Sequence, residues 1–461
     1  MAPNIENSRK MNGTILVFVP VTRVEEIAAM KCRILLLGLF VLTSTASAQL
    51  ASGRFTTSFY GWQGRSATLD KQTYLRGFEN VQFDFSQQRF SFNTNFQVSK
   101  DFGTVIGTDP ELRLSSLILK ARNIAGIADV SLGRQFVFAG VGNGLLDGGV
   151  AKGTVWDRKI GITVYGGYNV VQSRTLDFKR NLADNSLNGG QVTYMPNDDG
   201  IVGLSYMKRT RTPHPITTLR ADSLFNPYLV VIALSPNEEE YASVDARYNF
   251  IERVNVYARS DYDVNMTRLS RAELSARVAI FPALSATAEY LFREPRVAYN
   301  SIFSVFKANS TQEVEAGVEY EVSPLLRTYA RFADVVYKIS GSVNDNSGRV
   351  TVGGSYDFVN FSYTQNFGYA GDLNGVSIQA VYPMMERTLT PNFGLGFASY
   401  QLSDSDTKNT VLNTSIGATY RPKASLSTDV QLQWMRNPRY ANDMRLFVKV
   451  NYWFTERLSW F

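Results

Sequence analysis

The feature that most constrains this chain is an alternation of apolar and polar side chains that recurs about twenty times after residue 49. Each run covers about ten residues and ends at a break containing Gly, Pro, Asn, Asp or Ser, the residues that favour turns between strands. In residues 313–322, for example, Val314, Ala316 and Val318 alternate with glutamates. Because successive side chains of a strand point to opposite faces, the pattern predicts strands with one apolar and one charged face.

Alternation alone leaves two kinds of sheet open, a transmembrane barrel and a soluble β-sandwich or solenoid whose charged face lies in water. The number of runs exceeds the seven to nine strands of a sandwich. Aromatic residues also stand at the ends of runs, where an interfacial girdle would lie, and include Tyr320, Tyr382, Tyr420, Trp434, Tyr452 and Phe454. The expected fold class is therefore all-β, a transmembrane antiparallel β-barrel.

The number of strands follows from the runs and from the parity of the short breaks. Counting gives 21 runs, and single-chain bacterial barrels normally have an even number. The short breaks change parity between residues 136 and 190, which indicates one missed or one false strand there. Residues Tyr168–Phe178 are the candidate for a missed strand. We expect 20 to 22 strands, with 18 as the lower bound.

An export signal precedes the alternating region. Lys31 and Arg33 precede an apolar stretch from Ile34 to Leu42, and Ala46-Ser47-Ala48 ends the segment. This order is typical of a secretory signal peptide, so residues 30–48 are expected to be removed and residues 49–461 to form the barrel. Residues 1–29 match no part of the signal, and we interpret them as a misassigned N-terminal extension.

The composition argues against several other functions. No stretch after residue 50 approaches the roughly 18 to 20 apolar residues of a spanning helix. The one cysteine, Cys32, lies in the signal, and the one histidine, His214, lies between two prolines. Thiolate or histidine metal sites and Ser-His or Cys-His catalysis therefore lack their components, and we expect no enzyme, cofactor or metal. The formal net charge is +6, too small and dispersed to indicate a nucleic-acid partner.

The charged faces supply candidate pore-lining residues. A barrel of about 20 strands is too wide for its own side chains to fill, so inward polar residues imply water, a plug or a partner. The candidates, with two from the segment described next, are Arg134, Asp147, Arg271, Glu273, Arg277, Glu289, Arg293, Glu313, Glu315, Glu319, Glu321, Arg327 and Arg331.

The stretch Leu132-Gly133-Arg134-Gln135-Phe136 is followed by a glycine-rich segment containing Asp147-Gly148-Gly149. Here the chain resembles porin-like outer-membrane barrels, in which a Gly-Arg-Gln strand end leads to a long loop containing Asp-Gly. The resemblance covers about 25 residues and implies that Arg134 and Asp147 lie near the pore mouth or its constriction. The alternative is a flexible external loop with an arginine at the strand end.

The leading functional hypothesis is a passive or weakly selective channel for small hydrophilic solutes in the outer membrane of a Gram-negative bacterium. The alternative is a structural barrel, or an export or electron-transfer conduit, that holds a periplasmic partner. Expected partners are outer-membrane lipid and lipopolysaccharide, the solutes and the barrel assembly machinery, and the resemblance adds a homotrimer. Residues 209–238, the longest break, could fold inward, cover a neighbouring protomer or extend the adjacent strands.

Overall fold

Twenty-two antiparallel strands close into a single barrel in the computed structural model. The structure describes residues 49–65, 71–106, 109–170, 181–213, 215–221, 225–232, 234–251, 253–296, 310–338, 344–403 and 406–458. The signal segment, His214 and Phe461 lie outside the described residues. Among the described residues, no helix has the length and apolar character needed to cross a membrane.

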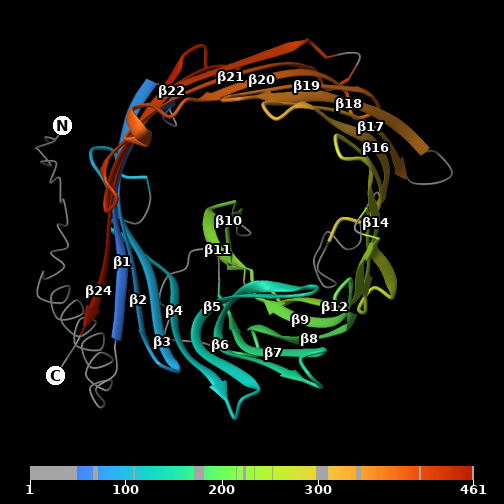
Figure 1. The fold of residues 1–461 in the computed structure, drawn as a ribbon. Helices are drawn as coiled ribbons and strands as arrows, with labels where there is room; N and C mark the ends of the chain where they lie inside the picture. The colour runs from blue at the N-terminus through green and yellow to red at the C-terminus, as the bar shows by residue number, and fades with distance from the viewer. Residues whose placement is uncertain are drawn as a thin grey trace, which may run out of the picture. The chain divides into compact units, whose positions relative to one another are not determined.

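The strands follow one another around the wall in chain order, and Figure 1 shows them as a ring. They are β1 (Gln49–Arg65), β2 (Lys71–Gln87), β3 (Phe90–Asp101), β4 (Glu111–Ile124), β5 (Ala128–Ala139), β6 (Gly142–Val155), β7 (Ile160–Asn169), β8 (Asn185–Asn197), β9 (Gly200–Arg211), β12 (Asn237–Phe250), β13 (Val254–Asp263), β14 (Arg268–Phe281), β15 (Leu284–Arg293), β16 (Ser310–Ser323), β17 (Leu326–Lys338), β18 (Asn344–Tyr356), β19 (Val359–Gly368), β20 (Asp372–Val381), β21 (Leu389–Gln401), β22 (Asn409–Lys423), β23 (Leu426–Arg436) and β24 (Asp443–Leu458).

The barrel closes between its first and last strands. β1 pairs with β24 from Gln49↔Leu458 to Trp62↔Arg445, so neither strand has a free edge along this length. Closure removes the exposed edges that hydrocarbon could not solvate. The count of 22 confirms the upper end of the expected range.

The missed strand is β6, and its predicted location was wrong. Tyr168 belongs to β7, and residues 171–178 lie outside the described residues. The supposed long loop after Arg134 is instead β6, which contains Asp147 and Gly148. Its glycines carry no side-chain alternation, and a Cβ would overlap the Tyr165 hydroxyl oxygen at Gly142 and the backbone of β7 at Gly148. At Gly148 a Cβ would overlap the Gly166 carbonyl oxygen of β7.

Short turns join most of the strands at one rim, and most connections at the other rim are longer. Two-residue turns follow β2 and β18, for example, whereas β9 and β12 are joined by the longest connection, whose described residues include a separate hairpin. This hairpin consists of β10 (Ile216–Ala221) and β11 (Pro227–Ile232) and falls within the ring in the projection of Figure 1. A 3₁₀ turn, η2 (Met385–Arg387), lies in the connection from β20 to β21. In bacterial barrels the rim with the short turns is the periplasmic one.

The outward face carries an apolar band above the short-turn rim. Outward residues in this band include Val81, Leu204 and Phe332. The upper edge of the band is marked by the outward charged side chains of Glu79, Lys208 and Asp334, each eight positions along its strand from that rim. With strands tilted by about 45° this corresponds to a height of ~20 Å, close to the band of about 25 Å in membrane barrels.

Candidate functional site

The inward face of β14 to β17 holds eleven of the sequence-predicted residues in one charged surface. The strand register places Arg271, Glu273 and Arg277 of β14 on the same face as Glu289 and Arg293 of β15. On β16 and β17 this face carries Glu313, Glu315, Glu319, Glu321, Arg327 and Arg331. We call these residues, with Arg349 introduced below, the charged wall.

Glu319 is the central acceptor of the charged wall. One of its carboxylate oxygens lies 2.8 Å from an Arg277 nitrogen, and the other lies 3.1 Å from an Arg331 nitrogen. Arg277 also donates to the Ser285 hydroxyl at 3.0 Å. Both guanidinium groups are more exposed than the carboxylate they share. The arginines therefore project further into the lumen than the acid that positions them.

Arg349 on β18 belongs to the same network and was missed in the sequence. Its guanidinium bridges Glu313 and Glu315 on β16, with a distance of 2.8 Å to Glu315. The residue between them on β17 is Ala333, which pairs with both Glu315 and Arg349 in the register. A short side chain there leaves room for the arginine to cross β17. Only the strand register could have revealed this partner.

Two members of the charged wall have no ion pair among the described residues. Glu289 lies beside Glu315 in the register, and Arg293 lies beside Arg271. Like charges directly opposite one another on neighbouring strands repel. The twelve charges of the wall are balanced, six arginines and six glutamates, so the surface carries strong local fields without a net charge.

Polar but uncharged side chains continue the inner face from β19 to β22. They include Ser362, Thr364, Ser377, Asn413 and Ser415. Many are short, so the wall here leaves more of the lumen free than the arginine-rich part does. From β14 to β22 the described inner face is thus divided into a charged sector and a neutral, hydroxyl-rich and amide-rich sector.

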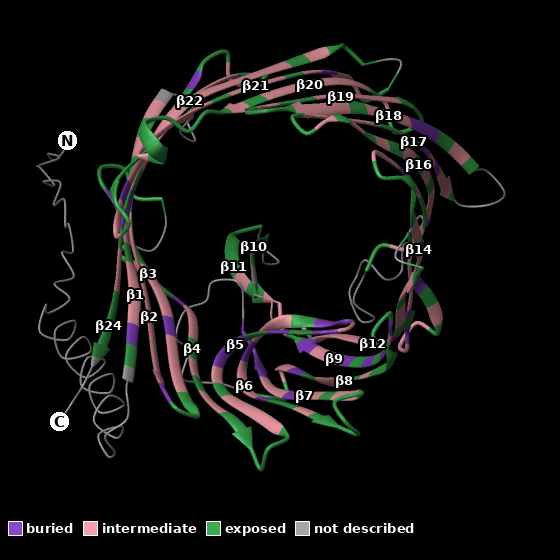
Figure 2. Ribbon diagram, viewed as in Figure 1, coloured by how far each residue is buried: buried purple, intermediate pink, exposed green. Residues whose placement is uncertain are grey.

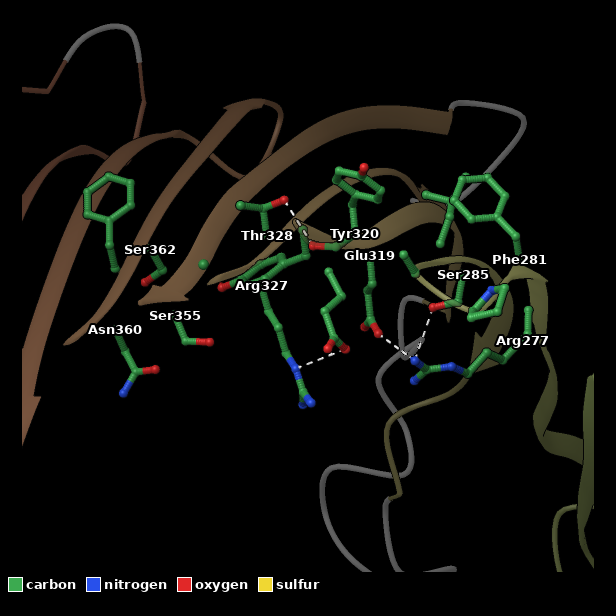
Figure 3. A pocket seen from close by; sticks show the side chains of 18 of the residues that line it. Arg277, Phe281, Ser285, Glu319, Tyr320, Arg327, Thr328, Ser355, Asn360 and Ser362 are labelled. Atoms are coloured by element: carbon green, nitrogen blue, oxygen red, sulfur yellow. Dashed lines mark hydrogen bonds and ion pairs between the residues drawn. The ribbon is translucent and has the colours of Figure 1, made fainter. Parts of the chain in front are cut away.

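A pocket of about 680 Å³ lies where these two sectors meet, near the short-turn rim. Figure 3 shows Arg277, Glu319 and Arg327 on one side, and Ser355, Asn360 and Ser362 on the other. Tyr329 covers Gly353, where a Cβ would lie 2.5 Å from the tyrosine hydroxyl oxygen. The pocket is therefore lined by charged side chains at one end and by neutral hydrogen-bonding side chains at the other.

Arg134 and Asp147 lie apart from the charged wall, in a buried ion pair. Their side chains are only 3% and 6% exposed. Two arginine nitrogens each lie 2.7 Å from an Asp147 oxygen, and a third donates to the Leu114 carbonyl of β4 at 3.0 Å. The β4–β5 ladder ends at the pair Leu117↔Arg134. The guanidinium thus joins β4 to β5 where their backbone pairing stops, and in this conformation neither charge is available to a solute.

Beyond this ion pair, the tip of the β5–β6 hairpin packs on the inner face of the wall. We call residues 135–146 the inward hairpin. Val141 N–H donates to the Ser205 hydroxyl of β9 at 2.9 Å. β6 also contacts β8 and β9, although β7 lies between β6 and β8 in the sheet, and β7 and β8 lie between β6 and β9. The buried cluster here contains Val137, Ala139, Val141, Leu146, Val150, Tyr165, Leu187, Met207 and Tyr241. Figure 2 shows buried residues on β5, β9 and β12.

A second inward contact lies beside this cluster. Asp261 on β13 is fully buried and pairs with Arg259 at 2.8 Å and with Arg296, which follows β15, at 2.9 Å. The Arg296 guanidinium also lies over the Tyr241 ring, 4.6 Å from its centroid. Asp261 therefore anchors the start of the β15–β16 connection to the inner wall, next to the inward hairpin.

Metal ligation has no support in the part of the chain that the structure describes, where no group of three or more His, Cys, Asp or Glu residues is placed to hold an ion. Five of the six glutamates of the charged wall form ion pairs with arginines; Glu289 is the exception among the described residues.

Comparison with known proteins shows a fold and no closer relationship. No protein-family model matches the chain, and no curated protein sequence matches it. A solved structure of the ferric enterobactin receptor PfeA of Pseudomonas aeruginosa has a TM-score of 0.56 at 10% identity, over 89% of this chain and 81% of the receptor.

Two further solved structures also match, with lower scores. OccAB4 of Acinetobacter baumannii has a TM-score of 0.43 at 7% identity, over 89% of this chain and 99% of OccAB4. OpdK of Pseudomonas aeruginosa, solved with vanillate, has a TM-score of 0.41 at 8% identity, over 88% of this chain and 99% of OpdK. The closed 22-stranded wall and its apolar outward band identify the chain as a transmembrane β-barrel, and the receptor likeness shows that it has the fold of outer-membrane barrels.

Proposed function

We propose that the mature chain, beginning near Gln49, is a porin-like channel for passive or weakly selective diffusion of small hydrophilic solutes. The observation that carries the proposal is the charged and polar inner face opposite an apolar outward face. Such a lining is stable only against water or a polar occupant, and a wall of this many strands is too wide for side chains to fill.

The mechanism would be filtering by size and charge, without chemistry on the solute. The inward hairpin and the anchored start of the β15–β16 connection both occupy lumen space on the β5–β15 side. A solute would therefore pass along the neutral sector, with the charged wall at its flank. Because the wall holds equal numbers of arginines and glutamates, discrimination between anions and cations is expected to be weak.

The width of the barrel supports one alternative function. Outer-membrane barrels of 22 strands include transporters whose lumen holds a plug. A barrel that holds a periplasmic partner, for export or electron transfer, would use the same polar lining as a contact surface. In that case the purified chain would cross the membrane without being an open channel until its occupant is lost.

Single-channel recording separates the two candidates. The full-length precursor would be expressed in a Gram-negative host, and the protein extracted from the outer-membrane fraction would be added to planar bilayers. Stable conductance steps in KCl are the expected result. Insertion without conductance, shown by protease protection in the same lipid, would reject the open channel and support an occupied lumen. Recovery from the periplasm instead of the outer membrane would reject both.

A further inference from the structure

The most exposed ion pair among the described residues lies at the edge of the pocket near the short-turn rim. Arg327 Nε lies 3.5 Å from Glu321, and the two side chains are 70% and 41% exposed. Neither terminal nitrogen of Arg327 has a partner among the described residues, since the one contact uses Nε. This pair is long and open, whereas Glu319 nearby is held by two guanidinium groups.

An open pair of opposite charges selects for the charge pattern of its ligand. A simple anion bound to Arg327 would weaken the existing contact and leave Glu321 without compensation. A simple cation bound to Glu321 would do the same to Arg327. A molecule with an ammonium and a carboxylate on one carbon can satisfy both side chains at once, with charge-assisted hydrogen bonds on each side.

The groups next to this pair are neutral and short enough to leave space. Arg327 pairs with Ser355, Ser355 with Asn360, and Asn360 with Gln379, which forms a row of inward side chains across four strands. Hydroxyl and amide groups of this row can donate to and accept from a polar substituent. A ligand with its charged end at Arg327 and Glu321 would extend along the row.

We propose that this pocket is a binding site for small zwitterions of the α-amino-acid type with a polar side chain. The inference rests on the proposed channel function, which gives such solutes access to the lumen. Glu321 would bind the ammonium group, Arg327 the carboxylate, and the Ser355–Asn360–Gln379 row the side chain. Glu319 would position Arg277 on the charged side of the pocket, across from the Ser355–Asn360–Gln379 row.

The test compares three solutes of nearly equal shape as blockers of the ion current. Serine carries both charges, glycerate replaces its ammonium with a hydroxyl, and serinol replaces its carboxylate with a hydroxymethyl group. The full-length protein, purified from outer membranes, is recorded in planar bilayers while each solute is titrated. Serine is expected to block at about fivefold lower concentration than either analogue, the scale of one exposed charge pair.

Variants assign the two charges. Arg327→Gln should weaken serine block about fivefold and leave serinol block unchanged. Glu321→Gln should weaken serine block by a similar factor and leave glycerate block unchanged. The exchange Glu321→Arg with Arg327→Glu keeps one residue of each sign and should restore serine block. Arg445→Gln removes an arginine paired with Asp443 on β24, away from the pocket, and should leave the serine response unchanged.

Each adverse outcome has its own meaning. Conductance with equal block by all three solutes would overturn the zwitterion site and leave the channel intact. An equal loss of serine block in Arg445→Gln would also overturn it, because the effect would then be general lumen charge. An absence of conductance in the wild-type protein would instead overturn the proposed channel function.

Discussion

Arg134 and Asp147 form a two-bond ion pair at the point where β5 separates from β4, with both donor–acceptor distances equal to 2.7 Å. The pair is almost fully buried and fixes the base of the inward hairpin. Because the charges compensate one another away from water, loss of either partner leaves an unpaired buried charge.

Replacement of Asp147 by alanine is therefore expected to destabilise the barrel by about 3–5 kcal/mol. The measurement is a urea titration of the refolded protein in lipid vesicles, followed by the gel mobility of unheated samples. Lys120→Gln is the control, since its ion pair with Asp129 is about one-third exposed and should contribute less than about 1 kcal/mol. Equal losses in the two variants would contradict a special role for the buried pair.

The apolar cluster beneath the inward hairpin gives a second prediction. Leu146 has no exposed surface, so Leu146→Ala should cost about 2–5 kcal/mol and loosen the hairpin. In bilayers, open-channel current noise should increase, because a loosened hairpin moves within the lumen. Leu274→Ala, at an outward and half-exposed position, is the control and should leave the noise unchanged. Unchanged current noise in a destabilised Leu146→Ala protein would show that the hairpin lies outside the ion path.

The charge balance of the lumen predicts how ion selectivity responds to one substitution. Arg349→Gln removes the guanidinium that Glu313 and Glu315 share, so cations should gain over anions. A roughly twofold rise in the cation-to-anion permeability ratio, ~0.4 kcal/mol, is expected from the reversal potential in a KCl gradient. The double variant Arg349→Gln with Glu313→Gln should return to the weak selectivity of the wild type. A change toward anions would be inconsistent with the assigned inner face.

A new charge should destabilise the barrel much more on the outward face of a strand than on its inward face. Ala288 on β15 faces outward within the apolar band, whereas its neighbour Thr287 faces the lumen. Ala288→Arg should cost about 2–4 kcal/mol in lipid, and Thr287→Arg should cost little. Urea titration in vesicles measures both. Similar losses for the two variants would argue that the alternation had been assigned to the wrong faces.

Side-chain alternation predicts most of the wall, because the strands carry the outward apolar residues that the membrane requires. On β6 the outward apolar residues Ala151 and Val155 are interrupted by glycines, and at Gly148 the backbone of β7 lies too close for a Cβ. At Gly133, on the neighbouring strand, φ is +115° and a Cβ would overlap the Leu117 carbonyl oxygen. Contacts of this kind leave no periodic trace in a sequence.

For the candidate site, the sequence predicts which side chains share a face of a strand, but not which of them pair. The sequence places the glutamates of β16 on one face of their strand and the arginines of β17 on one face of theirs, because within each strand they lie two or four residues apart. It gives no information on partners two strands apart, such as Arg349 and Glu315, which depend on the register and on the small Ala333 between them. It also cannot indicate that Arg134 is buried, because the positive φ of Gly133 interrupts the alternation just before it.

The pairing of β1 with β24 makes the two ends of the wall immediate neighbours, with Gln49 opposite Leu458. A short peptide could join these positions, and the chain could then begin and end elsewhere, for instance within the long connection between β9 and β12. Such a circular permutant would keep every strand pairing while changing which strands are made first. The order in which the strands leave the ribosome and the order in which they stand in the wall can therefore be separated experimentally.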